Sequence, residues 1–156
     1  MKIIKSRNKD FGKLILLRYL LIEHEALLDQ SVKVDLKKVK CAADYLRKCL
    51  KKKDHLYLLA LDKDLPCGYL HASLNLKDRA KSSYLSELYI MDAYRGKGIG
   101  KKLVKAYWDY ARRRGISIST LETLRENNDE TLNFYRKLRY FVIDVEGKMM
   151  HLEKTI

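Results

Sequence analysis

Leu88–Leu103 reads Leu-Tyr-Ile-Met-Asp-Ala-Tyr-Arg-Gly-Lys-Gly-Ile-Gly-Lys-Lys-Leu. The stretch begins with apolar residues typical of a strand, holds three glycines at its centre, and then enters a run with apolar side chains at helical spacing. The first turn of a helix leaves N–H groups unpaired at the positive end of the helix dipole. Glycine lets that backbone approach an anion closely. The stretch therefore predicts a strand, an anion-binding loop and a helix.

The glycine spacing argues against two common phosphate-binding loops. A nucleoside-triphosphate loop needs G-x-x-x-x-G-K-[ST]. Here Arg95 stands in place of its first glycine and Lys102 in place of its hydroxyl residue. The dinucleotide fingerprint is G-x-G-x-x-G, whereas Gly96, Gly98 and Gly100 are spaced G-x-G-x-G and follow several expected strands. Another phosphate-bearing ligand is therefore expected.

Residues 95–100, Arg-Gly-Lys-Gly-Ile-Gly, resemble the R/Q-x-x-G-x-G/A signature of the GCN5-related N-acetyltransferases (GNAT). That signature joins the fourth strand of the family's fold to its third helix. A second motif of the family resembles N-x-x-A-x-x-F-Y-x-K-L-G-F. Residues 128–140 read Asn-Asp-Glu-Thr-Leu-Asn-Phe-Tyr-Arg-Lys-Leu-Arg-Tyr, with Thr131 in place of alanine and Arg139 in place of glycine. The resemblance is strong over 84–142, whereas residues 1–60 fit only in element order.

Hydrophobic periodicity predicts seven strands and four helices. The strands are expected at 2–5, 56–61, 69–76, 84–91, 116–121, 140–145 and 148–154, and the helices at 11–29, 35–52, 100–114 and 129–138. A turn is expected at 65–68, where proline and glycine lie close together. The second helix should begin at its cap, Asp35, and bury the apolar stripe Leu36, Val39, Ala43, Leu46 and Leu50.

With the resemblance, this element order predicts an α/β (mixed α+β) GNAT-like fold. Its central sheet would be mixed and mostly antiparallel, with six to seven strands and helices on both faces. We expect one N-acetyltransferase domain over residues 1–156.

The resemblance implies an acyltransferase that moves an acetyl group from acetyl-coenzyme A (acetyl-CoA) to a primary amine, by direct attack in a ternary complex. It places the backbone of the fourth family strand beside the pantetheine arm and the glycine-rich loop around the pyrophosphate. The implied cofactor-binding residues are Tyr89, Ile90, Met91, Arg95, Gly96, Lys97, Gly98, Ile99, Gly100, Lys101, Asn128 and Tyr135.

Two residues are candidates for catalysis. By resemblance, Tyr135 is the general acid for the departing thiolate; the alternative is a tyrosine packed in the core. Glu87 is the candidate base, directly or through a water, because a carboxylate in an apolar strand has a raised pKa unless it is paired. The alternative is an ion pair with one of the many lysines. Asn128 is expected to cap the last helix, to bond the pantetheine arm, or both.

Tyr69 and His71 fall on the polar face of their expected strand. That face either lines the acceptor site or lies at the surface, and a surface role is the expectation.

The net charge of +13 suits nucleic acid, an anionic membrane or a polyanionic cofactor. Two alternatives follow: a basic nucleic-acid-binding module built on residues 35–53, and a non-catalytic acyl-CoA-binding protein. The acceptor stays open among a protein N-terminus, a lysine and a small amine, although the charge disfavours a polyamine. A homodimer formed through an exposed sheet edge also stays open.

Three cysteines without a secretion signal indicate a cytoplasmic protein with reduced thiols. The longest apolar run is too short to span a membrane, so no membrane association is expected. The four histidines are scattered and no C-x-x-C pair occurs, so no metal site is expected.

Overall fold

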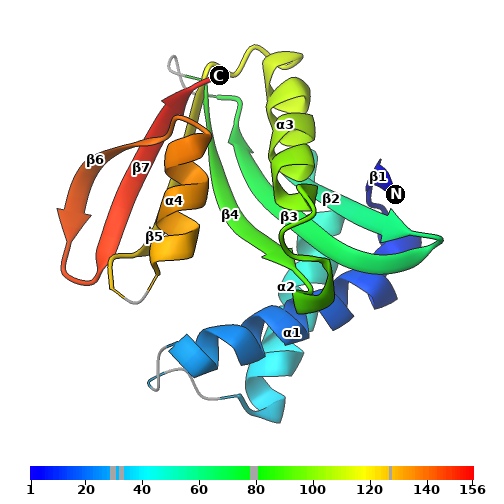
Figure 1. Cartoon of the computed structure of the whole chain (residues 1–156). Coiled ribbons are helices and arrows are strands. Elements are labelled where there is room, and N and C mark those ends of the chain that lie inside the picture. Colours follow the sequence, from blue (N-terminus) through cyan, green and yellow to red (C-terminus); the bar gives the residue numbers. More distant parts are fainter. Residues whose placement is uncertain (29–30, 32–33, 78–80, 127) are drawn as a thin grey trace.

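The computed structural model describes residues 1–28, 31, 34–77, 81–126 and 128–156, and its elements follow the predicted order (Figure 1). The strands are β1 (Lys2–Lys5), β2 (His55–Asp62), β3 (Leu65–Asn75), β4 (Ser82–Ile90), β5 (Ile118–Leu124), β6 (Phe141–Glu146) and β7 (Met149–Thr155). The helices are α1 (Phe11–Leu28), α2 (Leu36–Leu50), α3 (Ile99–Arg112) and α4 (Asp129–Lys137), with short 3-10 helices η1 (Asn8–Asp10) and η2 (Asp92–Tyr94). The predicted end of the first helix, residue 29, lies outside the described residues.

The described strands form one seven-stranded sheet in the order β1-β2-β3-β4-β5-β7-β6. Neighbouring strands run antiparallel except β4 and β5, which are parallel. The predicted mixed, mostly antiparallel sheet of six to seven strands is confirmed. The parallel pair needs a crossover connection, and α3 supplies it.

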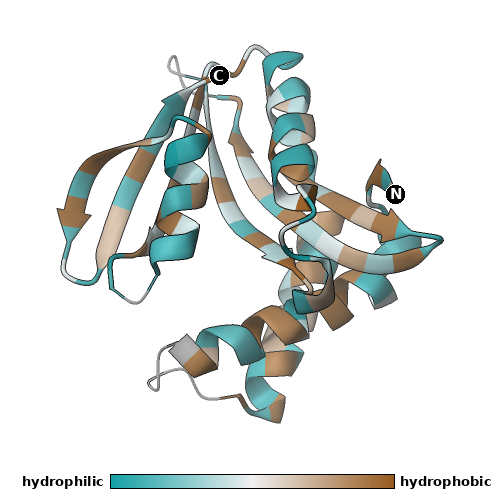
Figure 2. Cartoon of the chain, viewed as in Figure 1, coloured by the Kyte–Doolittle hydropathy of each residue, from teal (hydrophilic) through white to brown (hydrophobic). Residues whose placement is uncertain are grey.

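Helices cover both faces of the sheet, as predicted. On one face, Leu56, Leu58 and Ala60 of β2 belong to a core that also contains α3 and α4 residues. On the other face, Tyr57, Leu59 and Leu61 belong to a core that contains α1 and α2 residues. This alternation buries β2 on both sides, which explains its unbroken apolar run (Figure 2).

The predicted turn at 65–68 is wrong. β3 already begins at Leu65, and the chain reverses at Lys63 and Asp64, whose φ angles are 46° and 68°. Left-handed residues of this kind suit a tight hairpin, because their twist matches that of the flanking strands. Pro66 is accommodated inside β3 because the register with β2 shifts between Ala60 and Leu61.

The expected apolar stripe of α2 is also partly wrong. Asp35 caps the helix as predicted, accepting a hydrogen bond from the Lys38 N–H at 2.7 Å. Leu36, however, is 89% exposed, and the fully buried positions are Ala42, Leu46 and Cys49. The first turn of α2 therefore does not pack against the sheet. Cys49 occupies a core position that the predicted stripe, with Leu46 and Leu50 on either side, did not include.

Arg139 adopts the backbone conformation of the glycine that it replaces. Its φ is 62°, and the Tyr140 N–H donates to the Tyr135 carbonyl at 3.0 Å across the end of α4. The turn after α4 is therefore the left-handed cap that usually uses glycine, at the cost of some backbone strain.

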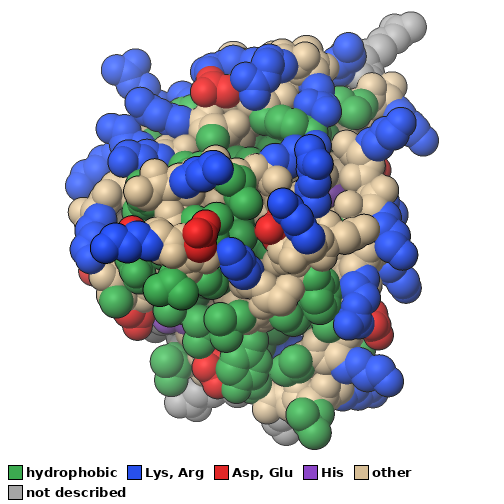
Figure 3. All heavy atoms as spheres, turned by 90° about the vertical axis from the view of Figure 1, so that its right-hand side faces the viewer, with side chains coloured by type: hydrophobic (Ala, Val, Ile, Leu, Met, Phe, Trp, Pro, Cys, Tyr) green, Lys and Arg blue, Asp and Glu red, His purple; other side chains and the backbone are tan. Residues whose placement is uncertain are grey.

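None of the described helices has the length and apolar content that a membrane-crossing helix requires. Figure 3 shows lysine and arginine side chains spread around one face of the molecule, with apolar side chains between them. The positive charge on this face is therefore not confined to a single helix.

Candidate active site

The glycine loop (Arg95–Lys101) connects η2 to the start of α3. Gly96 and Gly98 have φ angles of 73° and 74°, and Gly98 is the N-terminal cap residue of α3. A Cβ at either position would meet no atom within 4 Å, so the requirement for glycine there is conformational. At Gly100 the requirement is spatial, because a Cβ would lie 3.3 Å from the Phe134 ring of α4.

The cations of the glycine loop fix the loop itself. Arg95 donates from Nε to the Ile90 carbonyl at 3.2 Å and pairs with Asp92 at 2.9 Å. Lys97 donates to the Ala93 carbonyl at 2.9 Å. Lys101 lies exposed in the first turn of α3. The loop is thus tied to the end of β4, and the unpaired N–H groups of α3 lie beyond it.

β4 and β5 pair only at their beginnings. The parallel register covers Ser82–Tyr84 against Ile118–Thr120, after which the two strands diverge (Figure 1). A hydrogen-bonded cluster joins them at that point: Tyr107 of α3 shares hydrogen bonds with Ser83 of β4 and Ser119 of β5. Beyond this cluster, one edge of β4 has no strand partner among the described residues.

Ile90 is the predicted donor-site residue whose backbone faces the gap between β4 and β5. The Met91 N–H donates to the Cys67 carbonyl of β3 at 3.0 Å, so it is not available to a ligand. Backbone groups alternate along an antiparallel strand, so Tyr89 points toward β3 and the Ile90 N–H points away from it. Of the three predicted residues, Ile90 is the one whose backbone N–H is directed into that gap. Contact of these backbones with the pantetheine arm stays a prediction.

A β-bulge in β4 determines where Glu87 points. His71 of β3 pairs with Glu87, but the next residue, Ala72, pairs with Leu85, which leaves Ser86 as the extra residue. Simple alternation would put Leu85 and Glu87 on one face. The bulge instead leaves Leu85 in the core beneath α3 and turns Glu87 toward α1 and α2.

Glu87 is held by side chains from two other elements, α1 and β3. Arg18 of α1 pairs with its Oε1 at 2.9 Å, and the Tyr69 hydroxyl of β3 donates to its Oε2 at 2.8 Å. The predicted alternative, an ion pair, is thus present, with an arginine rather than a lysine. Burial raises the pKa of Glu87, while the Arg18 charge and the Tyr69 hydrogen bond oppose that rise. A positioned carboxylate with a raised pKa can act as a base near neutral pH.

An open cavity of about 300 Å³ lies beside Glu87, between α1 and α2. Its lining residues are Arg18, Leu21, Ile22, Glu25, Lys38, Cys41, Ala42, Tyr45 and Glu87. Burial and the negative charge of Glu87 both raise the pKa of Glu25. The cavity therefore contains two carboxylates that repel each other, together with cations at Arg18 and Lys38. Of this set, sequence reasoning found Glu87 alone, because the others come from helices without a motif.

Tyr135 lies in α4, in the core beneath α3. It is 6% exposed, and its ring meets the Phe134 and Tyr140 rings edge-on at 5.1 Å and 5.5 Å. Burial raises its pKa, so the hydroxyl stays protonated. Among the described residues no hydrogen-bond partner of that hydroxyl is found. Phe134 touches the glycine loop at Gly100, so α4 borders the predicted donor site.

Asn128 stands at the N-terminal cap position of α4, but its side chain does not cap the helix. Its amide donates instead to the Thr123 hydroxyl at 2.6 Å and to the Leu124 carbonyl at 3.1 Å, both in β5. The capping prediction is therefore wrong for the side chain, which anchors α4 to the end of β5.

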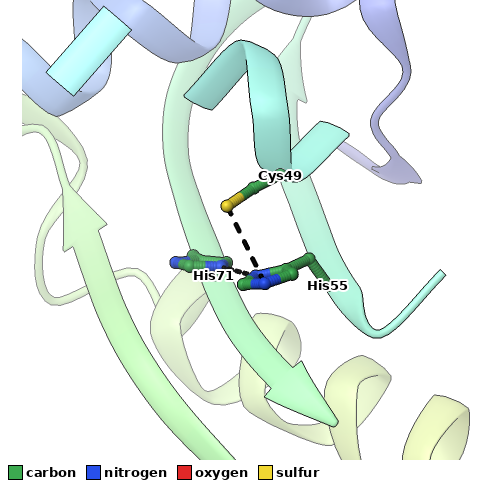
Figure 4. Close-up of side chains that lie close together, drawn as sticks. All are labelled: Cys49, His55 and His71. Carbon is green, nitrogen blue, oxygen red and sulfur yellow. Dashed lines mark hydrogen bonds between the residues drawn. The ribbon is translucent and has the colours of Figure 1, made fainter. Parts of the chain in front are cut away.

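The surface role expected for Tyr69 and His71 is wrong, because each is only 1% exposed. His71 stacks on Tyr57 with ring centroids 4.1 Å apart. Its Nε2 lies 2.9 Å from His55 Nδ1, and His55 Nε2 lies 3.8 Å from Cys49 Sγ (Figure 4). Cys49, His55 and His71 are scattered in the sequence but thus lie close together behind Glu87. Each of the three offers one atom that could bind a metal ion.

The chain is similar to known proteins in sequence and in fold. A model described as the acetyltransferase (GNAT) family matches residues 24–140. Over 58 residues the chain is 36% identical to mouse (Mus musculus) thialysine N-epsilon-acetyltransferase, which is 37% of this chain and 34% of that enzyme. The match thus spans about a third of the length of this curated relative.

Solved structures share the whole fold at low identity. The PaiA N-acetyltransferase of Thermoplasma acidophilum, solved with coenzyme A, has a TM-score of 0.80 at 20% identity, covering 99% of this chain and 98% of that one. Aminoglycoside 6'-acetyltransferase type Ii has a TM-score of 0.77 at 21% identity, covering 99% and 97%. These likenesses establish the fold.

Proposed function

The chain belongs to the acetyltransferase (GNAT) family, and we propose that it transfers the acetyl group of acetyl-CoA to a primary amine of a small, amino-acid-like molecule. The observation that carries this proposal is the position of Glu87. It lies at the wall of a cavity between α1 and α2, on the same strand that ends at the glycine loop. The strand thus links a cavity that contains two carboxylates to the segment that leads through η2 into the anion-binding loop.

The donor side fits a thioester of coenzyme A. The first turn of α3 and the left-handed glycines before it would bind the pyrophosphate. The pantetheine arm would enter the gap where β4 and β5 diverge, with the Ile90 N–H directed at the thioester carbonyl. Such a donor stabilises the oxyanion that forms during attack. Tyr135 would protonate the leaving thiolate.

The acceptor side fits a zwitterion. Burial and, after it, repulsion by Glu87 raise the pKa of Glu25, and an ammonium group between the two carboxylates would relieve that repulsion. Lys38, on the opposite helix, is a counter-charge for a carboxylate. A cavity of about 300 Å³ is at the lower end of the range for small-molecule sites, so it suits a small acceptor rather than a folded protein surface. The similarity to a thialysine acetyltransferase supports the same class.

Direct attack accounts for all the protons. Glu87 takes one proton from the bound ammonium, and the neutral amine attacks the thioester carbon. The C–N bond forms, the C–S bond breaks, and the electron pair leaves on sulfur. The second amine proton reaches the thiolate through Tyr135, so each turnover releases one proton from Glu87 to solvent.

The proposal is tested by measuring thiol release from acetyl-CoA with thialysine, with its analogue lacking the carboxylate, and with an N-terminal peptide. We expect thialysine to be the best of the three acceptors. Lys38→Met should raise KM for thialysine about tenfold, the order of one lost charge-assisted hydrogen bond, and should leave KM for the analogue unchanged.

Lys40→Met is the matched control, because Lys40 lies on α2 but does not line the cavity. Equal KM changes with both acceptors would refute the proposed carboxylate site. Faster turnover of the peptide would refute the small-molecule acceptor.

A further inference from the structure

We propose that His71 and His55 form a proton relay that carries the proton of Glu87 to the start of β2, outside the set of residues that line the acceptor cavity. This histidine relay rests on the proposed function, because it assumes that Glu87 is the base. It assigns a role to a hydrogen-bonded histidine pair, one member buried and one half-buried, whose members come from two neighbouring strands, β2 and β3, 16 residues apart.

Glu87 needs such an exit when the acceptor is bound. Its side chain is only 16% exposed, and it lines the cavity that the acceptor would fill. Arg18 and Tyr69 occupy both carboxylate oxygens, and neither is a proton acceptor for it: arginine stays charged, and the Tyr69 hydroxyl already donates. The proton that Glu87 takes from the ammonium therefore has no direct route to water while the cavity is filled.

His71 is the group that would accept the proton from Glu87. Its Nδ1 lies 3.9 Å from Glu87 Oε2, and it is buried without a hydrogen-bond partner among the described residues. Burial, together with the neighbouring His55 and Arg18, lowers the pKa of His71 to about 3, so its ring is neutral. In the tautomer that donates from Nε2 to His55, Nδ1 carries a lone pair and can accept a hydrogen bond. Glu87 becomes the donor when it is protonated and its carboxyl group turns toward the ring.

The two imidazole rings meet edge to edge rather than face to face. Their planes differ by 15°, and their centroids are 5.2 Å apart while the two nitrogens are 2.9 Å apart. Two imidazole rings in such an N–N contact reach their largest centroid separation when both rings lie along the line that joins the two nitrogens. The observed separation is that largest value, so both rings point along this line. This is the geometry of a straight N–H···N hydrogen bond (Figure 4).

The same geometry argues against a shared metal ion. Cys49, His55 and His71 offer ligand atoms within 4.8 Å of one another. A bound cation requires their lone pairs to converge on one point, whereas the facing nitrogens of His55 and His71 point at each other across a proton-sized gap. Tyr57 stacks flat on His71 at 4.1 Å and holds its ring in this plane.

The relay ends at His55, which is only half-buried at the start of β2. One transfer moves the Glu87 proton to His71 Nδ1 and the His71 Nε2 proton to His55 Nδ1. The His55 Nε2 proton, whose nitrogen lies 3.8 Å from Cys49 Sγ, then leaves this half-buried ring for solvent. No net charge stays on either ring. When the product leaves and water enters the cavity, the same steps run backwards: a proton from solvent enters at His55, both rings regain their first tautomers, and Glu87 receives a proton that it releases to the water now in the cavity.

The charged or titratable groups around the pair are known. They are Arg18 from α1, Tyr45 and Cys49 from α2, Lys52 and Asp54 from the α2–β2 connection, Tyr57 from β2 and Glu87 from β4. Of these, Glu87 alone is a carboxylate next to His71.

The kinetic test uses thialysine and acetyl-CoA with three variants. His55→Ala should lower kcat about tenfold or more with little change in either KM, because a proton-transfer step becomes limiting. Imidazole in the buffer should restore kcat, since the truncated side chain leaves room beside His71. Cys49→Ser, which keeps the packing next to His55, should match the wild type. Loss of kcat that imidazole does not restore would make His55 merely structural and overturn the relay.

Glu87→Gln separates the two proposals. If Glu87→Gln slows the reaction and His55→Ala does not, the relay is wrong but Glu87 remains the base. If Glu87→Gln has no effect, both the proposed base and the relay are wrong. Activity that is lost with a chelator and regained with Zn²⁺ would replace the relay by a metal site.

A measurement on the resting protein does not depend on the acceptor. In protein with ¹⁵N-labelled histidine, the shared proton should give a scalar coupling between His55 Nδ1 and His71 Nε2, and no other histidine pair should show one. Absence of the coupling would overturn the relay even if every variant were unfolded or inactive.

Discussion

The donor side and the acceptor side of β4 are built in opposite ways. On the donor side, the glycine loop and the start of α3 are one continuous stretch, and most of their geometry follows from backbone angles at Gly96 and Gly98. On the acceptor side, Glu87 depends on Arg18 from α1 and Tyr69 from β3, 69 and 18 residues away in sequence. The first site can be recognised in a linear sequence, whereas the second exists only once the chain has folded.

This contrast predicts how each side fails. Changes in the glycine loop should weaken cofactor binding and leave the chemistry intact. Changes around Glu87 should slow the chemistry and leave cofactor binding intact. A variant that moved both quantities equally would show that the two sides are not separate.

The largest effect is expected for Glu87→Gln. Loss of a general base typically costs about 100-fold or more in rate, while affinity for coenzyme A should not change. Because burial raises the pKa of Glu87, wild-type activity should fall as the pH drops through a value above the ordinary range near ~4.3 for glutamate. The variant should lack this acidic limb in a profile of kcat/KM against pH.

Glu122→Gln is the control for that experiment, since this carboxylate lies on β5 and pairs with His151 at 3.3 Å. If Glu87→Gln kept the wild-type profile, Glu87 would be an ion-pair partner of Arg18 and not a base.

A smaller effect is expected for Gly98→Asp. A side chain at φ 74° costs about 1–2 kcal/mol, and a negative charge would repel the pyrophosphate. Affinity for coenzyme A, measured by calorimetry, should fall about tenfold or more. Gly147→Asp puts the same residue at φ 56° in the β6–β7 turn, so it carries a similar strain away from the loop. Equal affinity losses in both variants would mean that strain alone, and no local site, explains the result.

The smallest effect is expected for Tyr135→Phe. If the hydroxyl protonates the thiolate, kcat should fall about tenfold while KM for acetyl-CoA stays constant, since a general acid acts in the transition state. Tyr110→Phe removes a hydroxyl that bonds Lys5 at 2.8 Å on the outer side of α3, and it should change neither. Unchanged turnover in Tyr135→Phe would leave Tyr135 a core residue that packs against Tyr140.

The sequence by itself determined the element order, the glycine loop and the family. Local rules suffice there. Gly96 and Gly98 provide left-handed backbone angles within the strand–loop–helix unit, and Gly100 leaves room for the neighbouring Phe134 ring. The errors also have local causes: sequence periodicity cannot show that the first turn of α2 lies clear of the sheet, or that the Asn128 amide finds better partners in β5.

Only the tertiary structure decided in which direction Glu87 points and which side chains contact it. Strand alternation places Leu85 and Glu87 on the same face, and only the bulge at Ser86, a property of the pairing between β3 and β4, separates them. Direct pairing of β3 with β4 puts His71 opposite Glu87, and the pairing of β2 with β3 adds His55. These contacts depend on the register between strands, and register is set by turn geometry together with which face of each strand is buried, so a one-residue slip would turn every side chain to the other face.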